Sequence, residues 1–259
     1  MKVVILAGGL GTRLTEETVL KPKPMVEIGG KPILWHIMKI YSNYGFNDFV
    51  ICLGYKGYMI KEYFINYYLY NSDITVELGN NKVDIHYTNS ESFKVTLVDT
   101  GLETNTAGRI KKIEKYIGNE PFMLTYGDGV SDINLNELIK FHKQHKKLAT
   151  LTSVELPGRY GNIDVDGSGQ VTHFQEKPEE NDFWINGGFF VLEPGIFNYL
   201  KGDVEHVQWE KGPLINIAND KQLMAYKHKG FWKCMDAMRD KIELDELWVN
   251  NNAKWKTWK

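Results

Sequence analysis

Residues 2–14 read Lys-Val-Val-Ile-Leu-Ala-Gly-Gly-Leu-Gly-Thr-Arg-Leu, an apolar run that leads into glycines, a threonine and an arginine. After Lys2 the run to Ala7 is β-branched and apolar without alternation, which predicts a strand buried on both faces, as in a parallel sheet. Glycines directly after a strand let backbone N–H groups approach an anion closely, and Arg13 adds a planar donor that is always charged. The stretch therefore predicts a buried first strand that ends in an anion-binding turn.

Strand and helix patterns alternate after this turn. Pro32 is expected to open an amphipathic helix that ends near Tyr44, and a strand at 48–53 and a helix at 59–70 follow. This alternation predicts a right-handed, doubly wound α/β sheet. Further strands are expected at 83–87, 94–99, 121–125, 149–154, 188–192 and 221–226, and further helices at 108–116, at 135–145 and from residue 236.

From Pro157 onward the pattern becomes strand-rich. Asp166-Gly167 is a turn signal, which predicts a hairpin between residues 162–165 and 170–175. No internal repeat or low-complexity linker interrupts the chain. We therefore predict one α/β domain over residues 1–235, followed by a C-terminal extension over 236–259 whose tryptophans pack down.

Composition excludes several classes of protein. The chain has 259 residues, of which 42% are hydrophobic and 25% charged, and its net charge is −2. Such a balanced chain has no strong electrostatic reason to bind nucleic acid or an anionic membrane. Cys52 and Cys234 form no Cys-x-x-Cys pair, and no apolar run is long enough for a signal peptide or a bilayer span. We expect a soluble cytoplasmic protein with two reduced thiols.

The glycine turn by itself is a weak signal, and a plain tight turn is an open alternative. Its spacing is neither the dinucleotide fingerprint nor a P-loop. The next element, Lys21-Pro22-Lys23-Pro24-Met25, is more specific, because prolines hold the chain extended and limit where a lysine can point. We expect Lys23 to meet a phosphate and Lys21 to be a solvated surface residue.

Together, residues 6–14 and 21–25 resemble the signature of the sugar nucleotidyltransferases, although Glu16 stands where many members carry proline. The resemblance implies a Rossmann-like mixed sheet flanked by helices, with a nucleotide-binding part over about 1–130 and a small strand-rich sugar-phosphate part over about 131–235. For Thr106 a helix N-cap is the open alternative. The nucleotide contacts that the resemblance implies are Leu6, Gly8, Gly9, Gly11, Thr12, Arg13, Lys23, Thr106 and Arg109.

Two aspartates are candidate metal ligands. Asp128 lies between glycines after a predicted buried strand, where open α/β sheets bind their ligands. Asp236 ends a late Trp-x-x-x-Asp stretch. The resemblance implies that both hold Mg²⁺, a cation that takes oxygen ligands. An Asp-Gly turn for Asp128 and a helix N-cap for Asp236 are the alternatives, and Asp132 is a competing ligand of lower rank.

The sugar-phosphate side is assigned by resemblance alone. Lys177 is expected to contact the phosphate, Glu176 the sugar hydroxyls, and Asn186 and Gly188 the far side of the sugar. A lone Glu-Lys-Pro sequence is a surface turn in most proteins. It gains weight here from its order after Arg13 and the other motif residues.

The implied reaction is attack by a sugar 1-phosphate oxygen on the α-phosphorus of a nucleoside triphosphate, with Arg13, Lys23 and Lys177 as the catalytic cations. Residues 23–36 and 255–258 resemble the branch of the family that makes CDP-glucose from CTP and glucose 1-phosphate, a precursor of deoxysugars in O-antigen. The resemblance also implies a homo-oligomer, with a hexamer expected. Two alternatives stay open: UTP or dTTP in place of CTP, and a non-catalytic regulatory subunit.

Overall fold

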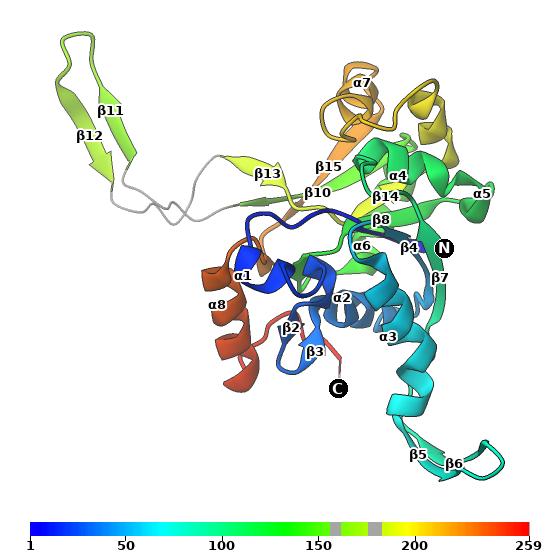
Figure 1. Ribbon diagram of the computed structural model, residues 1–259. Helices are drawn as coiled ribbons and strands as arrows, with labels where there is room; N and C mark the ends of the chain where they lie inside the picture. The colour runs from blue at the N-terminus through cyan, green and yellow to red at the C-terminus, as the bar shows by residue number, and fades with distance from the viewer. Residues whose placement is uncertain (156–161, 176–182, 259) are drawn as a thin grey trace.

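An eight-stranded mixed sheet forms the centre of the computed structural model, which describes residues 1–155, 162–175 and 183–258 (Figure 1). The strand order is β13-β10-β14-β8-β1-β4-β7, and β15 pairs with β10. Strands β7, β4, β1 and β8 run parallel, whereas β14 lies antiparallel between β8 and β10. This arrangement confirms the expected mixed α/β fold. The bounds are β1 (Val3–Ala7), β4 (Asp48–Leu53), β7 (Lys94–Asp99), β8 (Phe122–Tyr126), β10 (Ala149–Glu155), β13 (Trp184–Asn186), β14 (Phe190–Leu192) and β15 (Leu223–His228).

Within the part of the chain that the structure describes, four two-stranded sheets lie outside the central one. The pair around Asp166-Gly167 confirms the expected hairpin, and its second strand begins one residue later than predicted. The pair β9–β16 joins the middle of the chain to a segment near its C-terminal end, and this pairing becomes important for the site. These sheets are β2 (Glu27–Ile28) with β3 (Lys31–Pro32), β5 (Ser72–Glu77) with β6 (Lys82–Thr88), β9 (Gly129–Ser131) with β16 (Trp232–Cys234), and β11 (Asn162–Val165) with β12 (Val171–Gln175).

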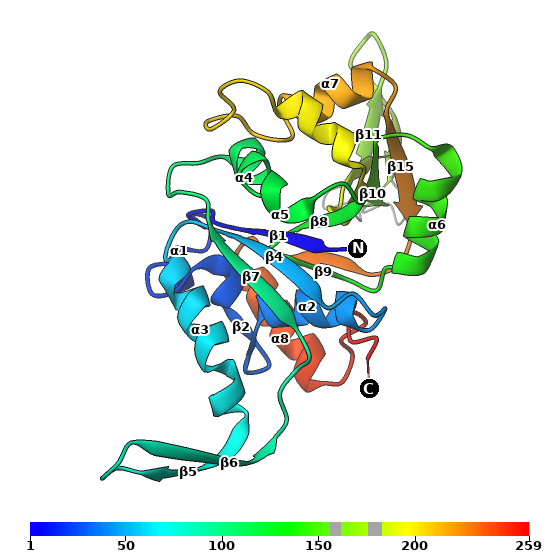
Figure 2. The same ribbon diagram turned by 90° about the vertical axis from the view of Figure 1, so that its right-hand side faces the viewer.

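Helices cover both faces of the central sheet. In Figures 1 and 2, α2, α3 and α8 lie on one side of it, and α4, α5 and α7 lie on the other. No helix among the described residues combines the length and the apolar character needed to cross a bilayer. The helices are α1 (Thr15–Thr18), α2 (Ile33–Ser42), α3 (Gly57–Tyr70), α4 (Thr106–Lys112), α5 (Glu114–Ile117), α6 (Leu135–His145), α7 (Pro213–Asn219) and α8 (Met238–Val249), with 3₁₀ helices η1 (Lys23–Met25) and η2 (Pro194–Leu200).

The two faces explain why the first strand shows no alternation in sequence. Val3, Ile5 and Ala7 belong to the hydrophobic core on one side of the sheet, and Val4 and Leu6 to the core on the other. All five residues are buried, because each face of β1 is covered by helices. A strand with two covered faces needs apolar residues at every position.

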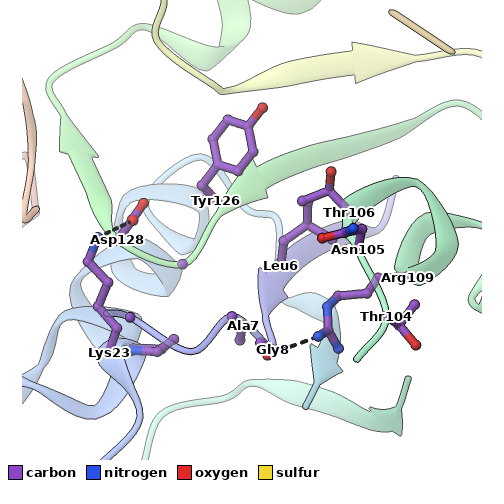
Figure 3. Close-up of a pocket in the computed structure, with 14 residues that line it drawn as sticks. Leu6, Ala7, Gly8, Lys23, Thr104, Asn105, Thr106, Arg109, Tyr126 and Asp128 are labelled. Atoms are coloured by element: carbon purple, nitrogen blue, oxygen red, sulfur yellow. Dashed lines mark hydrogen bonds and ion pairs between the residues drawn. The ribbon is translucent and has the colours of Figure 1, made fainter. Parts of the chain in front are cut away.

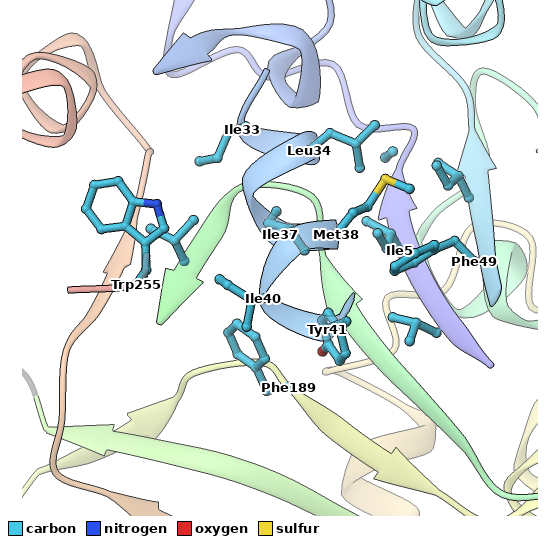
Figure 4. Packing of buried hydrophobic residues seen from close by; sticks show 14 of the residues in the cluster. Ile5, Ile33, Leu34, Ile37, Met38, Ile40, Tyr41, Phe49, Phe189 and Trp255 are labelled. Carbon is cyan, nitrogen blue, oxygen red and sulfur yellow. The ribbon is translucent and has the colours of Figure 1, made fainter. Parts of the chain in front are cut away.

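Helix α2 supplies much of the first core. Its apolar residues point toward β1 and β4 and toward Phe189 and Trp255 (Figure 4). Trp255 is fully buried and stacks on Phe231 and Trp248, so the tail packs down on its own chain. The C-terminal segment is therefore part of the core.

Several predicted boundaries were wrong, among them the strand expected at 221–226, which spans Leu223–His228, and three of the differences have local backbone reasons. The helix expected at 108–116 is interrupted at Ile113, whose φ of −97° and ψ of 0° separate α4 from α5. The strand expected from Gly188 starts only at Phe190, because Gly188 and Phe189 both have positive φ angles. The last long helix begins at Met238, which leaves Asp236 in the preceding loop.

Candidate active site

A cavity of about 210 Å³ lies at the carboxyl ends of β1 and β8 (Figure 3). Most of the nucleotide-binding residues predicted from the sequence line it, and Thr12 and Arg13 lie outside its lining. Such a place, at the carboxyl ends of parallel strands, is where open α/β sheets bind ligands. The lining consists of Leu6, Ala7, Gly8, Gly9, Gly11, Lys23, Pro24, Thr104, Asn105, Thr106, Arg109, Tyr126, Gly127 and Asp128.

Lys23 joins the two predicted metal ligands at one end of this cavity. Its Nζ donates to Asp128 Oδ2 at 2.7 Å and to Asp236 Oδ1 at 2.8 Å. Arg13 donates from Nη1 to the other oxygen of Asp236 at 2.9 Å. The chain thus gathers two cations and two carboxylates from three distant segments, which we call the lysine–aspartate cluster (Arg13, Lys23, Asp128 and Asp236).

The opposite charges in this cluster shift the pKa values of Lys23 and Asp236 toward their ionised forms. Burial by itself would lower the pKa of Lys23, but the carboxylates of Asp128 and Asp236 outweigh burial and raise it above its ordinary value. Burial opposes ionisation of Asp236 too, yet the hydrogen bond and charge of Lys23 and the charge of Arg13 hold its pKa below the usual range. Lys23 is therefore a cation and Asp236 an anion at neutral pH.

The backbone fixes the two aspartates relative to each other. Strands β9 and β16 pair with Gly129 opposite Cys234, and Met235 N donates to the carbonyl of Asp128 at 2.9 Å. Met235 is fully buried, whereas Cys234 and Asp236 on either side of it face the cluster. One ligand atom each of Asp128, Cys234 and Asp236 lie within 4.8 Å of one another.

This geometry suits a divalent cation. Two carboxylates at close range repel each other unless a positive charge lies between them, and here the Lys23 ammonium fills that role. Carboxylate oxygens are also the donors that hard divalent cations prefer. The competing candidate, Asp132, instead pairs with His228 at 3.0 Å. Ala237, and not Asp236, is the N-cap of α8, so the N-cap interpretation of Asp236 was wrong.

Arg109 lies at the opposite end of the cavity. Its charge suggested a contact with a nucleotide, but in this structure its guanidinium binds the protein chain. It is only 4% exposed, and its two terminal nitrogens donate to the chain itself, including to Gly8 O at 2.9 Å. Arg109 thereby holds the glycine turn in place, and its contact with a nucleotide stays a prediction. Its remaining acceptors are Leu53 O, Thr100 Oγ1, Gly101 O and Leu102 O.

Two residues predicted to contact the sugar, Asn186 and Gly188, are among the described residues and lie next to Tyr126 of the cavity lining. Asn186 donates from Nδ2 to Tyr126 Oη at 3.2 Å and accepts from Gly188 N at 2.9 Å. Gly188 has a φ of +77°, which favours glycine at this position. Glu176 and Lys177 lie outside the described residues, so their predicted roles remain predictions.

The family model described as "Nucleotidyl transferase" matches residues 2–240 of the chain. The chain belongs to this family. Glucose-1-phosphate cytidylyltransferase of Salmonella typhi is 54% identical to it, with 100% of both chains covered. The probable glucose-1-phosphate cytidylyltransferase of Bacillus subtilis is 45% identical, again with 100% of both chains covered.

Solved nucleotidyl transferase-like structures agree with the fold. HddC from Yersinia pseudotuberculosis, in a complex with GMP-PN, superposes with a TM-score of 0.68 at 26% identity. The match covers 95% of this chain and 99% of that one. The likeness therefore extends over nearly the whole nucleotidyl transferase chain.

Sequence reasoning missed several polar residues of this nucleotidyl transferase site. Tyr126 Oη donates to Glu210 Oε1 at 2.5 Å, and Thr106 Oγ1 donates to Glu210 Oε2 at 3.0 Å. Thr106 is the first residue of α4 and Asn105 is its N-cap, so the N-cap alternative for Thr106 was wrong. Glu210 carried no signal, because a glutamate in a polar loop is ordinary in any sequence.

The contact between the glycine turn and Arg109 leads to a first prediction. A Cβ added at Gly8 would lie 2.2 Å from Arg109 Nη1, whereas one at Gly9 would meet nothing within 4 Å. We expect Gly8→Ala to lower the free energy of unfolding by about 1–3 kcal/mol, the usual cost of overpacking. Gly9→Ala, the matched control, should leave it nearly unchanged. Urea denaturation of both variants measures the difference, and equal unfolding midpoints would contradict it.

Proposed function

We propose that this nucleotidyl transferase moves CMP from CTP to glucose 1-phosphate, giving CDP-glucose and pyrophosphate. The observation that carries the proposal is the lysine–aspartate cluster beside the glycine turn: Lys23 and Asp128 line the cavity, and Asp236 with Arg13 is hydrogen-bonded to them. The choice of CTP and glucose rests on the relatives, which match at 54% and 45% identity over their whole length. CDP-glucose of this kind would serve deoxysugar synthesis for surface polysaccharide.

In the proposed reaction, an oxygen of glucose 1-phosphate forms a bond to the α-phosphorus of CTP. The bond from that phosphorus to the bridging oxygen breaks, and pyrophosphate carries away the electron pair. The attacking oxygen is already ionised at neutral pH, so no covalent enzyme nucleophile is required. The protein must instead bring two polyanions together and offset their charge. We assign this task to Lys23 and Arg13 on the triphosphate and to Lys177 on the sugar phosphate.

We also propose that Asp128 and Asp236 hold Mg²⁺ when CTP binds. The ion would neutralise charge on the phosphate oxygens. Both carboxylates are hydrogen-bonded to Lys23 in this structure. If these carboxylates held a metal ion, the N–H donors of Lys23 would be available to the triphosphate.

Metal dependence gives a second prediction. Chelation of Mg²⁺ should abolish turnover. Asp236→Asn should raise the Mg²⁺ concentration needed for the half-maximal rate by about tenfold or more. Even changing a residue that only hydrogen-bonds to a metal ligand lowers metal affinity or activity by about 10–100-fold. Asp220→Asn is the matched control, because Asp220 accepts a hydrogen bond from Tyr199 at 2.7 Å far from the cluster. Titration of initial rates against Mg²⁺ measures both variants. An unchanged requirement in Asp236→Asn would remove Asp236 from the metal site.

A pyrophosphate-release assay tests the function as a whole. Purified protein is given glucose 1-phosphate and Mg²⁺ with CTP, UTP or dTTP in turn. We expect the largest kcat/KM with CTP. A larger kcat/KM with UTP or dTTP would refute the base assignment, and no release with any triphosphate would favour a non-catalytic regulatory subunit.

A further inference from the structure

The cavity has two chemically different ends. Lys23 and Asp128 lie at one end, and Thr104, Thr106 and Arg109 at the other, as Figure 3 shows. A triphosphate must lie at the end that offers the Lys23 ammonium and the carboxylates of the proposed metal site, because its charge needs them. The base must then occupy the other end, beside the first residues of α4.

Thr106 lines this base end, and the proton of its hydroxyl is already donated to a neighbouring carboxylate. A threonine hydroxyl has one proton to donate and two lone pairs that accept. Thr106 Oγ1 donates to Glu210 Oε2 at 3.0 Å and accepts from Trp209 N at 2.7 Å. The one hydrogen-bonding capacity left on this hydroxyl is a lone pair.

Thr104, which also lines this end of the cavity, has the same pattern of one donated and one accepted hydrogen bond. Its Oγ1 donates to Glu205 Oε1 at 3.0 Å and accepts from Lys112 Nζ at 3.1 Å. Hydrogen bonds from Lys112 and then from Thr104 hold the pKa of Glu205 below its usual range, so this carboxylate is an acceptor at neutral pH. Two hydroxyls of the cavity lining therefore have their protons held by glutamates of one loop.

Glu210 accepts hydrogen bonds through both of its carboxylate oxygens, whereas the bonds to Glu205 all reach one oxygen. Besides the Thr106 proton, its carboxylate accepts the proton of Tyr126, which in turn accepts from Asn186. Thr106 and Tyr126 thus each donate to a different oxygen of Glu210, which fixes the orientation of this carboxylate as an acceptor. The direction of the Thr106 hydrogen bond is set by the charge of Glu210.

We propose that Glu210 is a specificity-determining residue that selects a base carrying an exocyclic amino group. Because its own O–H points at Glu210, Thr106 offers the base an acceptor. Cytosine presents an amino group at position 4, which donates, whereas uracil and thymine present a carbonyl oxygen, which would face a lone pair. Sites that leave a buried polar group facing the wrong partner discriminate strongly between such analogues. This inference rests on the proposed function, because it assumes a nucleoside triphosphate in the cavity.

The test compares the binding of CTP and UTP, which requires no turnover. Dissociation constants for both nucleotides with Mg²⁺ are measured by titration calorimetry for the wild type, Glu210→Gln and Thr106→Val. The amide of Glu210→Gln can donate to Thr106, which turns the threonine proton toward the base, and Thr106→Val removes the hydroxyl without changing the side-chain shape. We expect the affinity ratio of CTP to UTP to fall by about tenfold or more in either variant, which corresponds to one hydrogen bond of about 1.4 kcal/mol.

Control variants distinguish a loss of base specificity from a general loss of nucleotide binding. Thr106→Ser keeps the hydroxyl and should keep the ratio, and Asp220→Asn changes a carboxylate–hydroxyl pair elsewhere. A merely structural role for Glu210 would weaken both nucleotides equally and leave the ratio unchanged. If Glu210→Gln fails to fold, Thr106→Val carries the test alone.

The outcomes for the inference and for the function are distinct. A wild-type protein that binds CTP and UTP equally, or variants whose ratio stays within about twofold of the wild type, would overturn the inference. Preference for CTP that is lost in Thr106→Val supports it, even if no pyrophosphate is released. Turnover with CTP and an unchanged ratio in both variants would leave the proposed function standing and the inference refuted.

Discussion

Replacing Lys23 by alanine is expected to lower kcat/KM by about 10²–10³-fold, or about 2.7–4 kcal/mol, which is the scale of a lost preorganised donor. Lys23 is the residue that contacts both aspartates of the cluster, and its side chain is only 12% exposed. Without it, Asp128 and Asp236 face each other with only Arg13 as a neighbouring cation. The pyrophosphate-release assay measures the loss.

Lys21→Ala is the matched control for this variant. Lys21 lies two residues away on the same Lys-Pro segment, but its Nζ pairs with Glu27 at 3.3 Å and does not reach the cluster. We expect its activity to stay within about twofold of the wild type, because surface ion pairs contribute little. Unimpaired activity in Lys23→Ala would end the assignment of the cluster as the active site.

Trp255→Ala should lower the free energy of unfolding by about 3–5 kcal/mol, the usual range for a buried large aromatic residue cut back to alanine. Trp255 is fully buried and packs against Phe231, Trp248 and His36. Its removal leaves a cavity that α2 and α8 cannot readily fill. Urea denaturation followed by circular dichroism measures the change.

Val249→Ala is the control for the tail. Val249 ends α8 and is 72% exposed, so its truncation should change the free energy of unfolding by less than about 0.5 kcal/mol. A Trp255→Ala variant as stable as Val249→Ala would mean that the tail does not belong to the core.

The core of the fold was predictable where burial leaves a clear pattern. The unbroken apolar run at β1 identified a parallel strand covered on both faces, and the strands at 48–53 and 94–99 and helix α6 have the predicted bounds. The break at Ile113 was not predictable, because no glycine or proline marks it. The late start of β14 depends on the positive φ of Phe189, a conformation that sequence rarely signals for a phenylalanine.

The candidate site, like the fold, was predictable from the sequence only in part. Motif order placed Lys23, Asp128 and Asp236 together, and the structure brings them within hydrogen-bonding distance. The direct pairing of the lysine with both aspartates could not be foreseen, since nothing in a motif states which side chains touch. Glu210 could not be found either, because its importance comes from the two hydroxyls that meet it in space.

Lys23 and Asp236 are 213 positions apart along the chain and 2.8 Å apart in space. The ribosome must therefore release nearly the whole polypeptide before these two groups can meet. A nascent or partly melted molecule keeps the lysine and the carboxylates on separate segments and has no centre for chemistry. We therefore expect the lysine–aspartate cluster to assemble only in a chain whose tertiary structure is complete.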